Sequence, residues 1–152
     1  MTGDKRLREA ENFIHQQIPI TQAMGVRVVA NDARGFVVEA PVALNYNHLR
    51  TGFGGSINAV ATLAGYGLLW LELRDDKLSH VVVAESSIRF LRPVRETIRA
   101  ICLRPNQRKI DAFRSTLALK GKASMMLEVI IEEDSETAAE FEGTFVALKN
   151  RG

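Results

Sequence analysis

A polar loop that leads directly into a pair of glycines and an apolar run is the part of this sequence best suited to chemistry. The loop carries the amides Asn45 and Asn47, and the pair is Gly54-Gly55. Where such a pair opens a helix, a ligand oxygen can approach backbone N–H groups that have no partner within the helix. The helix dipole adds positive potential at the same place. We therefore expect Gly54, Gly55 and Ser56 to polarise a bound carbonyl, as in an oxyanion hole.

A plainer alternative makes these three residues a tight turn in which Ser56 caps the helix. Ser56 as an acyl nucleophile would need a base beside it, and none is visible in the sequence. His48 lies in the same loop and has the chemistry to donate a proton, although an exposed loop histidine is the simpler interpretation. Cys102 alternates with apolar neighbours along a predicted strand, which places it in the core.

The predicted helix is notable for the side chains that it lacks. Residues 57–71 contain no carboxylate, and the loop has the amides Asn45 and Asn47 but no acid; an amide cannot act as a general base near neutral pH. Simple hydrolysis of an ester or thioester thus lacks its usual base. Asn58 and Thr62 are expected to line a pocket from the helix, with bonding to their own helix as the alternative. Phe53, next to the glycines, is expected to contact a bound substrate.

Composition indicates one ordinary globular domain over residues 1–152, with 46% apolar and 25% charged residues. One cysteine excludes an internal disulfide, and three scattered histidines predict no metal site. The charged N-terminus has no apolar signal segment, and the longest apolar run, residues 59–71, is shorter than the roughly 18 residues that a membrane-spanning helix needs. These features predict a cytoplasmic protein without a membrane partner.

The elements that must position the loop follow from apolar spacing and turn residues. An amphipathic cover helix is expected within residues 1–18, and a buried helix over residues 56–74. A short helical insert is expected over 108–120, before Gly121. Strands are predicted at residues 25–31, 36–40, 80–91, 97–104, 124–133 and 138–149.

This order predicts an α+β fold in which a mostly antiparallel sheet of about six strands wraps around the apolar helix. Gly65 and Gly67 inside that helix each cost about 1 kcal/mol relative to alanine. We therefore expect them to allow close approach of the sheet or of a second helix. One sheet around one helix leaves edge strands and apolar surface exposed, which predicts a homodimer, with a dimer of dimers left open.

The loop sequence NYNHLRTGFGGS, residues 45–56, resembles the N-x-N-x-x-x-T-x-F-x-G-S signature of one branch of the hot-dog fold. That branch is known as a thioesterase domain, sometimes fused to an acetyltransferase domain. Its members are associated with malonyl-ACP decarboxylation, which supplies acetyl-ACP for fatty-acid synthesis. Weaker matches are ATLAG at 61–65, RFLRP at 89–93 and EGTFVAL at 142–148, so that the resemblance covers about residues 20–149.

The resemblance implies a hot-dog fold and a malonyl-ACP decarboxylase, with no cofactor because phosphopantetheine arrives with the ACP or CoA substrate. Decarboxylation needs no base, since loss of carbon dioxide generates the thioester enolate directly and the enzyme must stabilise its negative charge. Asn45 as a neutral donor, together with the Gly54 and Gly55 amides, suits that task, whereas an Asp at position 45 would repel the charge.

Two alternatives remain at this stage. One is a thioesterase of the same fold, which would recruit water through Asn45 and Thr51. The other is a non-catalytic module that binds acyl thioesters. The product distinguishes them: an acetyl thioester, a free acid with a free thiol, or none.

The basic residues are concentrated between Arg89 and Lys109. Such a stretch could steer an acidic carrier protein, although a solvated strand face is the simpler interpretation. Phe90 is the one aromatic residue close to the arginines of the strand, so a nucleic-acid partner is not expected.

Overall fold

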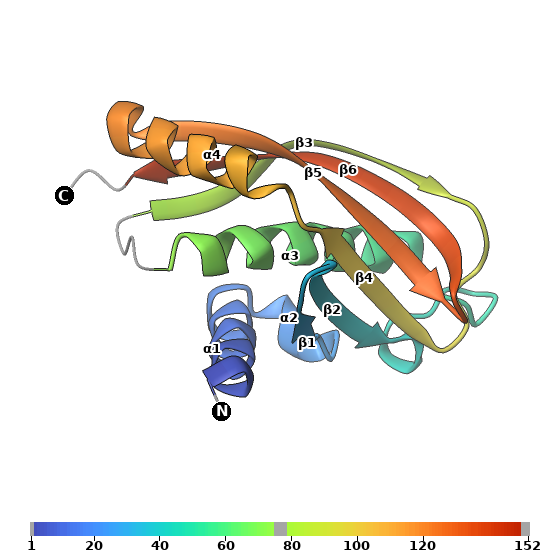
Figure 1. Ribbon diagram of the computed structural model, residues 1–152. Helices are drawn as coiled ribbons and strands as arrows, with labels where there is room; N and C mark the ends of the chain where they lie inside the picture. The colour runs from blue at the N-terminus through green and yellow to red at the C-terminus, as the bar shows by residue number, and fades with distance from the viewer. Residues whose placement is uncertain (1, 75–78, 150–152) are drawn as a thin grey trace.

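The fold is a six-stranded antiparallel sheet curved around one long helix (Figure 1). The computed structural model describes residues 2–74 and 79–149. The helical elements are α1 Thr2–Gln17, α2 Ile20–Ala23, a 3-10 turn Val42–Leu44, α3 Gly54–Glu72 and α4 Gln107–Lys120. The strands are β1 Arg27–Asn31, β2 Gly35–Pro41, β3 Ser79–Phe90, β4 Thr97–Leu103, β5 Lys122–Glu133 and β6 Glu136–Lys149. The α+β class and the six strands are thereby confirmed.

The strand order is β1-β2-β4-β5-β6-β3, so β1 and β3 lie at the two edges. β3 pairs with β6 along its whole length, from Ser79 opposite Lys149 to Phe90 opposite Ala139. A register shift between Val83 and Glu85 marks a bulge near the middle of β3. The outer side of this long strand has no strand partner among the described residues, and Val82 is half exposed.

The sheet packs closely against the buried helix α3. At two positions of the helix the contact leaves no room for a side chain. A Cβ at Gly65 would lie 2.4 Å from Cζ of Phe145, and one at Gly67 would lie 2.3 Å from Cε1 of Phe36. Phe36, on β2, and Phe145, on β6, are both fully buried. The expectation that these glycines allow close approach of the sheet is confirmed.

α1 covers the part of α3 that the sheet leaves open. The Phe13 ring stacks on the Trp70 ring with 5.0 Å between the ring centroids. The centroid of the Tyr66 ring lies 6.4 Å from that of Phe13. Ala10 and Ile14 are buried in the same core, as their helical spacing predicts. The short helix α2 was not predicted.

The first strand is shorter than predicted. It was expected from residue 25 but begins at Arg27, because Gly25 adopts a φ of +68°, which is not an extended conformation. The N–H of Gly25 donates to Gln22 O, and that of Val26 donates to Thr21 O. These two residues therefore form the connection out of α2.

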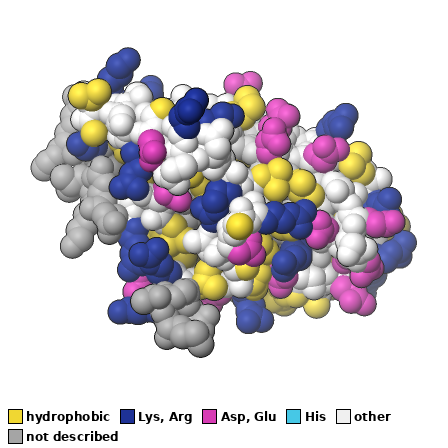
Figure 2. Space-filling model, viewed as in Figure 1, with side chains coloured by type: hydrophobic (Ala, Val, Ile, Leu, Met, Phe, Trp, Pro, Cys, Tyr) yellow, Lys and Arg dark blue, Asp and Glu magenta, His cyan; other side chains and the backbone are white. Residues whose placement is uncertain are grey.

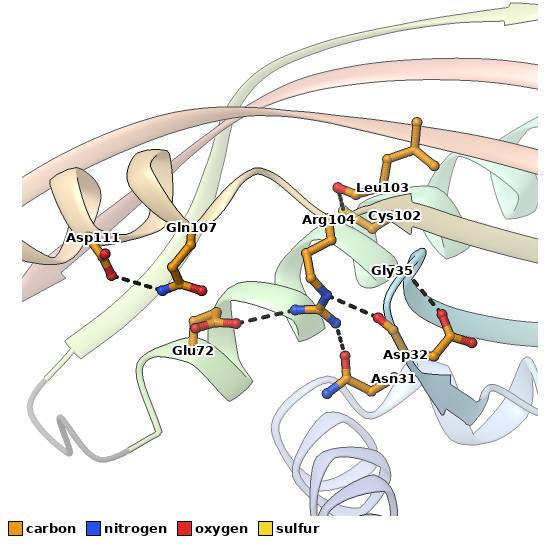
Figure 3. Close-up of polar contacts among 9 residues, drawn as sticks. All are labelled: Asn31, Asp32, Gly35, Glu72, Cys102, Leu103, Arg104, Gln107 and Asp111. Atoms are coloured by element: carbon orange, nitrogen blue, oxygen red, sulfur yellow. Dashed lines mark hydrogen bonds and ion pairs between the residues drawn. The ribbon is translucent and has the colours of Figure 1, made fainter.

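Arg104 ties the C-terminal end of α3 to the β1–β2 hairpin (Figure 3). Its Nε donates to Asp32 O at 3.0 Å, and its guanidinium also bonds Asn31 Oδ1 and Glu72 Oε1, the latter at 3.3 Å. α4 follows directly and packs Phe113 and Leu117 into the common core. The helical insert predicted at 108–120 is confirmed, one residue longer at its start.

None of the described helices has the length and hydropathy to span a membrane. Within the same residues, no group of three His, Cys, Asp or Glu side chains is placed to hold a metal ion.

Candidate active site at the first turn of the central helix

Asn45 anchors the loop that precedes α3. Its side chain is only 5% exposed, and its Nδ2 donates to Met24 O and to Pro41 O, both at 2.8 Å. Its backbone oxygen accepts from the N–H of Phe53 at 2.8 Å. Since both side-chain N–H groups are used by the protein, Asn45 has none left for a ligand in this arrangement. Its position holds the start of the loop against the helix N-terminus.

Asn47 and Thr51 close the loop tip on itself. Asn47 Oδ1 accepts from the backbone N–H groups of Leu49 at 2.9 Å and of Thr51 at 3.1 Å. Asn47 Nδ2 also lies 3.1 Å from Thr51 Oγ1. This closed loop accommodates Arg50 at a φ of 65°, and the Arg50 guanidinium lies 4.6 Å from the centroid of the Tyr46 ring. The polar side chains of the motif therefore build the loop.

The first turn of α3 presents backbone donors without acceptors. The N–H of Ile57 donates to Phe53 O, whereas those of Gly54, Gly55 and Ser56 make no hydrogen bond within the described residues. Phe53 is the N-cap in an extended conformation, and its side chain makes no capping bond. The alternative in which Ser56 is the cap is therefore wrong. The three free N–H groups lie where the helix dipole is positive.

Aromatic rings flank this turn. A Cβ at Gly54 would lie 3.3 Å from Cζ of Phe90, and one at Gly55 would lie 2.6 Å from Cε2 of Phe53. Both phenylalanines are 54% exposed, and Leu91 beside them is 52% exposed. Phe90 comes from the end of β3, far from the loop in sequence, and sequence reasoning did not assign it to the site. Together these side chains give the turn an apolar surround.

Asn58 and Thr62 follow on the next turns of α3 and differ in their bonding. Thr62 Oγ1 donates to the backbone oxygen of Asn58 at 2.9 Å, so this hydroxyl satisfies its own helix. Asn58 Oδ1 is fully buried and has no hydrogen-bond partner in the described protein. A buried polar atom in that condition costs about 1–3 kcal/mol. Of the two, only Asn58 has a buried polar atom without a hydrogen-bond partner among the described residues.

No carboxylate is bonded into this region. Among the described residues, no hydrogen bond joins an Asp or Glu side chain to loop 45–53 or to the first turn of α3, and the one acid within α3 is Glu72 in its last turn. Glu72 lies about 27 Å from Gly54 at 1.5 Å per residue. His48 is exposed. Burial raises the pKa of the Cys102 thiol to about 12, opposed only weakly by Arg104, so this core cysteine is not a nucleophile.

The basic stretch predicted as a docking surface is largely neutralised. Arg89 pairs with Glu140, and Arg92 with Glu136. Arg99 pairs with Glu39. Arg104 pairs with Glu72 and also bonds the β1–β2 hairpin (Figure 3). For these arginines, a solvated strand face is therefore a better interpretation than a docking surface for an acidic carrier protein.

A single antiparallel sheet around a buried helix, with free amides at the helix start, defines a hot-dog domain of the thioesterase superfamily. Within that class the chain belongs to the family described as "Putative thioesterase (yiiD_Cterm)", whose model matches residues 7–149.

Solved structures are similar over nearly the whole chain. The protein OLEI01261 of unknown function from Chlorobaculum tepidum TLS is 29% identical, with a TM-score of 0.90 and 97% of each chain covered. A "putative thioesterase" from Shewanella oneidensis is 28% identical, with a TM-score of 0.85, covering 95% of this chain and 99% of that one. PA5026 from Pseudomonas aeruginosa, described as a "Probable Thioesterase", is 24% identical with a TM-score of 0.80 over 94% and 95% of the chains, which shows a shared fold.

Proposed function

We propose that the protein decarboxylates a malonyl thioester held against the first turn of α3. One observation carries the proposal: the N–H groups of Gly54, Gly55 and Ser56 are free, and no described Asp or Glu side chain is hydrogen-bonded to this turn or to loop 45–53. Donors without a base suit a reaction that develops negative charge on a carbonyl oxygen but removes no proton.

The proposed reaction breaks one carbon–carbon bond. The electron pair of the bond between the malonyl carboxylate and Cα moves into the thioester, which becomes an enolate as carbon dioxide leaves. The free N–H groups of the first turn stabilise the enolate oxygen, and a proton from water then adds to Cα to give an acetyl thioester. The half-exposed rings of Phe53 and Phe90 offer the bound malonyl group an apolar surround, which favours conversion of its carboxylate into neutral carbon dioxide.

In this proposal Asn58 accepts a hydrogen bond from the ligand, and Asn45 does not make the donation to the enolate oxygen first predicted for it. Both N–H groups of Asn45 are bound to Met24 and Pro41, whereas the amide oxygen of Asn58 is buried without a partner. An amide N–H of the pantetheine arm is a suitable donor for that oxygen. Asn45, Asn47 and Thr51 then act as positioning residues that hold the loop.

We also propose that the protein works as a homodimer joined through β3. Its outer side is unpaired among the described residues, and Val82 and Val83 are 50% and 40% exposed. Pairing with a second β3 would give hydrogen-bond partners to the unpaired backbone N–H and C=O groups of this edge, and it would cover these side chains. Light scattering at micromolar concentration should report twice the 16.9 kDa chain mass, and a monomer would contradict the dimer.

Hydrolysis of an acyl thioester is the second candidate, because the family is described as a thioesterase. It requires a water-activating group, which a second protomer would have to bring to the first turn. The experiment is to incubate the protein with malonyl-ACP, malonyl-CoA and S-malonyl-pantetheine, and to weigh the products. Decarboxylation yields acetyl thioesters, whereas malonate with free thiol would establish hydrolysis instead. No turnover of any substrate would favour a binding module.

A further inference from the structure

α4 carries several exposed cations and one exposed leucine. Ile110, Phe113 and Leu117 are buried, and Leu119 is 86% exposed on the opposite side of the helix. Four exposed cations share the helix with it, and we call them and Leu119 the α4 face: Arg108, Lys109, Arg114 and Lys120.

The charge of the α4 face is not balanced within the described protein. None of its four cations forms an ion pair with a described residue, unlike Arg89, Arg92 and Arg99. The one acid on α4, Asp111, accepts a hydrogen bond from Gln107 at 2.8 Å. Figure 2 shows Lys and Arg over α4 with few acids among them, and most acidic side chains toward the opposite end of the molecule.

This combination fits an acidic protein better than a nucleic acid. Protein interfaces combine apolar contacts with charged side chains, and unpaired cations attract a partner of opposite charge. Nucleic-acid surfaces add exposed aromatic rings for base stacking, and the one aromatic residue of α4, Phe113, is buried. An acyl carrier protein is acidic and carries the thioester that the proposed function requires.

α4 is remote from the first turn of α3 in its own protomer. It follows Arg104, which bonds Glu72 at the last turn of α3, about 27 Å from Gly54. A carrier bound at α4 therefore lies near the last turn of α3, far from the first turn of the same protomer.

Pairing through β3 brings α4 close to the first turn in the other protomer. A two-fold axis across β3 sets the copies antiparallel, so the Phe90 end of one lies beside the Ser79 end of the other. Phe90 packs near Gly54 of its own chain. Ser79 pairs with Lys149, whose N–H donates to O of Gly121, the C-cap of α4. The first turn of one protomer and α4 of the other then share one end of the dimer.

We propose that an acidic acyl carrier protein docks on the α4 face of one protomer and delivers its thioester to the first turn of α3 in the partner. The inference rests on the proposed function and on the dimer through β3. It replaces the stretch from Arg89 to Lys109 as the docking surface and retains only that stretch's last two residues.

The first test reverses charge on the α4 face. Arg108→Glu with Lys109→Glu should raise KM for malonyl-ACP about ten-fold at low salt, with less effect as salt rises. Both positions lie in the first turn of α4, where acids are well tolerated. KM for malonyl-CoA and S-malonyl-pantetheine should stay unchanged. Leu119→Ser, at an exposed position, should raise KM for the ACP substrate alone by about three-fold, a loss of the size expected for a small apolar contact.

The matched control is Lys5→Glu with Arg8→Glu, which changes the net charge equally on the exposed side of α1. It should leave all three substrates unaffected. Equal loss with ACP and CoA substrates would indicate binding of nucleotide phosphates and would overturn the proposal. Unchanged KM for malonyl-ACP would overturn it as well. A wild type that turns over none of the three substrates refutes the proposed function instead.

The second test asks which protomer receives the thioester. Dimers are purified through two different tags so that one protomer carries Gly54→Pro and the other carries the α4 charge reversals. If delivery crosses the dimer, the carrier docks on the first protomer and reacts in the second, so about half of the wild-type turnover of malonyl-ACP survives. When turnover is measured well below KM at low salt, delivery within one protomer predicts a further loss of about ten-fold with malonyl-ACP, because the one active protomer then has the impaired docking face. Malonyl-CoA would still be consumed, and that outcome would refute the crossing.

Discussion

The four glycines of α3 occupy two regions of one helix and serve opposite purposes. Gly65 and Gly67 lie at its middle, where the rings of Phe145 and Phe36 occupy the space that a side chain would need. Gly54 and Gly55 lie at its start, where backbone N–H groups have no acceptor and the surroundings are half exposed. The first pair brings the helix against the sheet, while the second leaves donors accessible.

The difference between the two regions separates stability from function. The middle of α3 is fully packed, and its last turn is tied by Glu72 to Arg104 (Figure 3). The first turn keeps unpaired donors and is followed by Asn58, whose buried oxygen has no partner. Unsatisfied groups reduce stability, and they concentrate where a ligand would satisfy them. Substitutions in the two regions should therefore have opposite signatures.

The largest effect is expected when one donor is removed from the first turn. Gly54→Pro deletes the N–H at the first helical position, where proline is tolerated, and Phe53 already has the extended φ of −66° and ψ of 130° that a following proline requires. Turnover should fall by about 10²–10³, or about 2.7–4 kcal/mol. Gly54→Ala keeps the N–H and is the control. Equal activities in the two folded variants would remove this N–H from the mechanism.

The second effect concerns the loop that positions this turn. Asn45→Ala leaves the carbonyls of Met24 and Pro41 without their donor, and we expect a loss of about 2–3 kcal/mol in the free energy of unfolding, measured by urea denaturation. Asn45→Asp is nearly isosteric but has no N–H groups, so it should destabilise at least as much. If either variant kept wild-type stability and lost only turnover, Asn45 would regain its first predicted role as a catalytic donor.

A smaller effect, on stability alone, is expected in the middle of the helix. Gly67→Ala places a Cβ against the buried Phe36 ring, and the strain should exceed the gain in helix propensity, for a net loss of about 1–2 kcal/mol. Turnover per folded molecule should not change. Thermal unfolding and the rate at saturating substrate are the two measurements. A stabilised variant would show that the sheet can move away from α3.

The smallest change in stability is expected at Asn58. Asn58→Leu removes a buried oxygen that has no partner, so the free energy of unfolding should stay the same or rise by about 0.5 kcal/mol. KM for S-malonyl-pantetheine should rise by about five-fold because a hydrogen bond to the ligand is lost. Thr62→Val is the control, since its hydroxyl already bonds the helix. Destabilisation without a change in KM would make Asn58 a structural residue.

The sequence predicts most of the fold because its signals are local. Apolar residues on every side of residues 57–71 indicate a buried helix, and the alternating runs predict strands whose observed bounds differ by only a few residues. The start of β1 was misplaced because a glycine at positive φ looks the same in sequence as one in a strand. α2 is a single turn, too short for any periodicity to be visible.

The site is harder to predict, because the roles of its side chains depend on distant partners. Asn45 lies in the right motif, yet its amide is bound by Met24 and Pro41, which no spacing within the loop reveals. Phe90 reaches the glycines only through the path of β3. The backbone donors, in contrast, follow from a helix start that the glycine pair already indicates, and for this reason Gly54 and Gly55 could be identified before any coordinates.

The pairing of β3 with β6 has a consequence for how the protein is made on the ribosome. β1 with β2 and β5 with β6 are neighbours in sequence, so each hairpin closes soon after it is synthesised. β3 pairs only with β6 among the described strands, across the 70 residues that separate Ser79 from Lys149. A twelve-residue strand with exposed valines thus emerges well before its partner and stays unpaired on both edges during translation of β4 and β5. During that interval β3 is open to pairing with the wrong strand, and slow translation after it would lengthen that exposure.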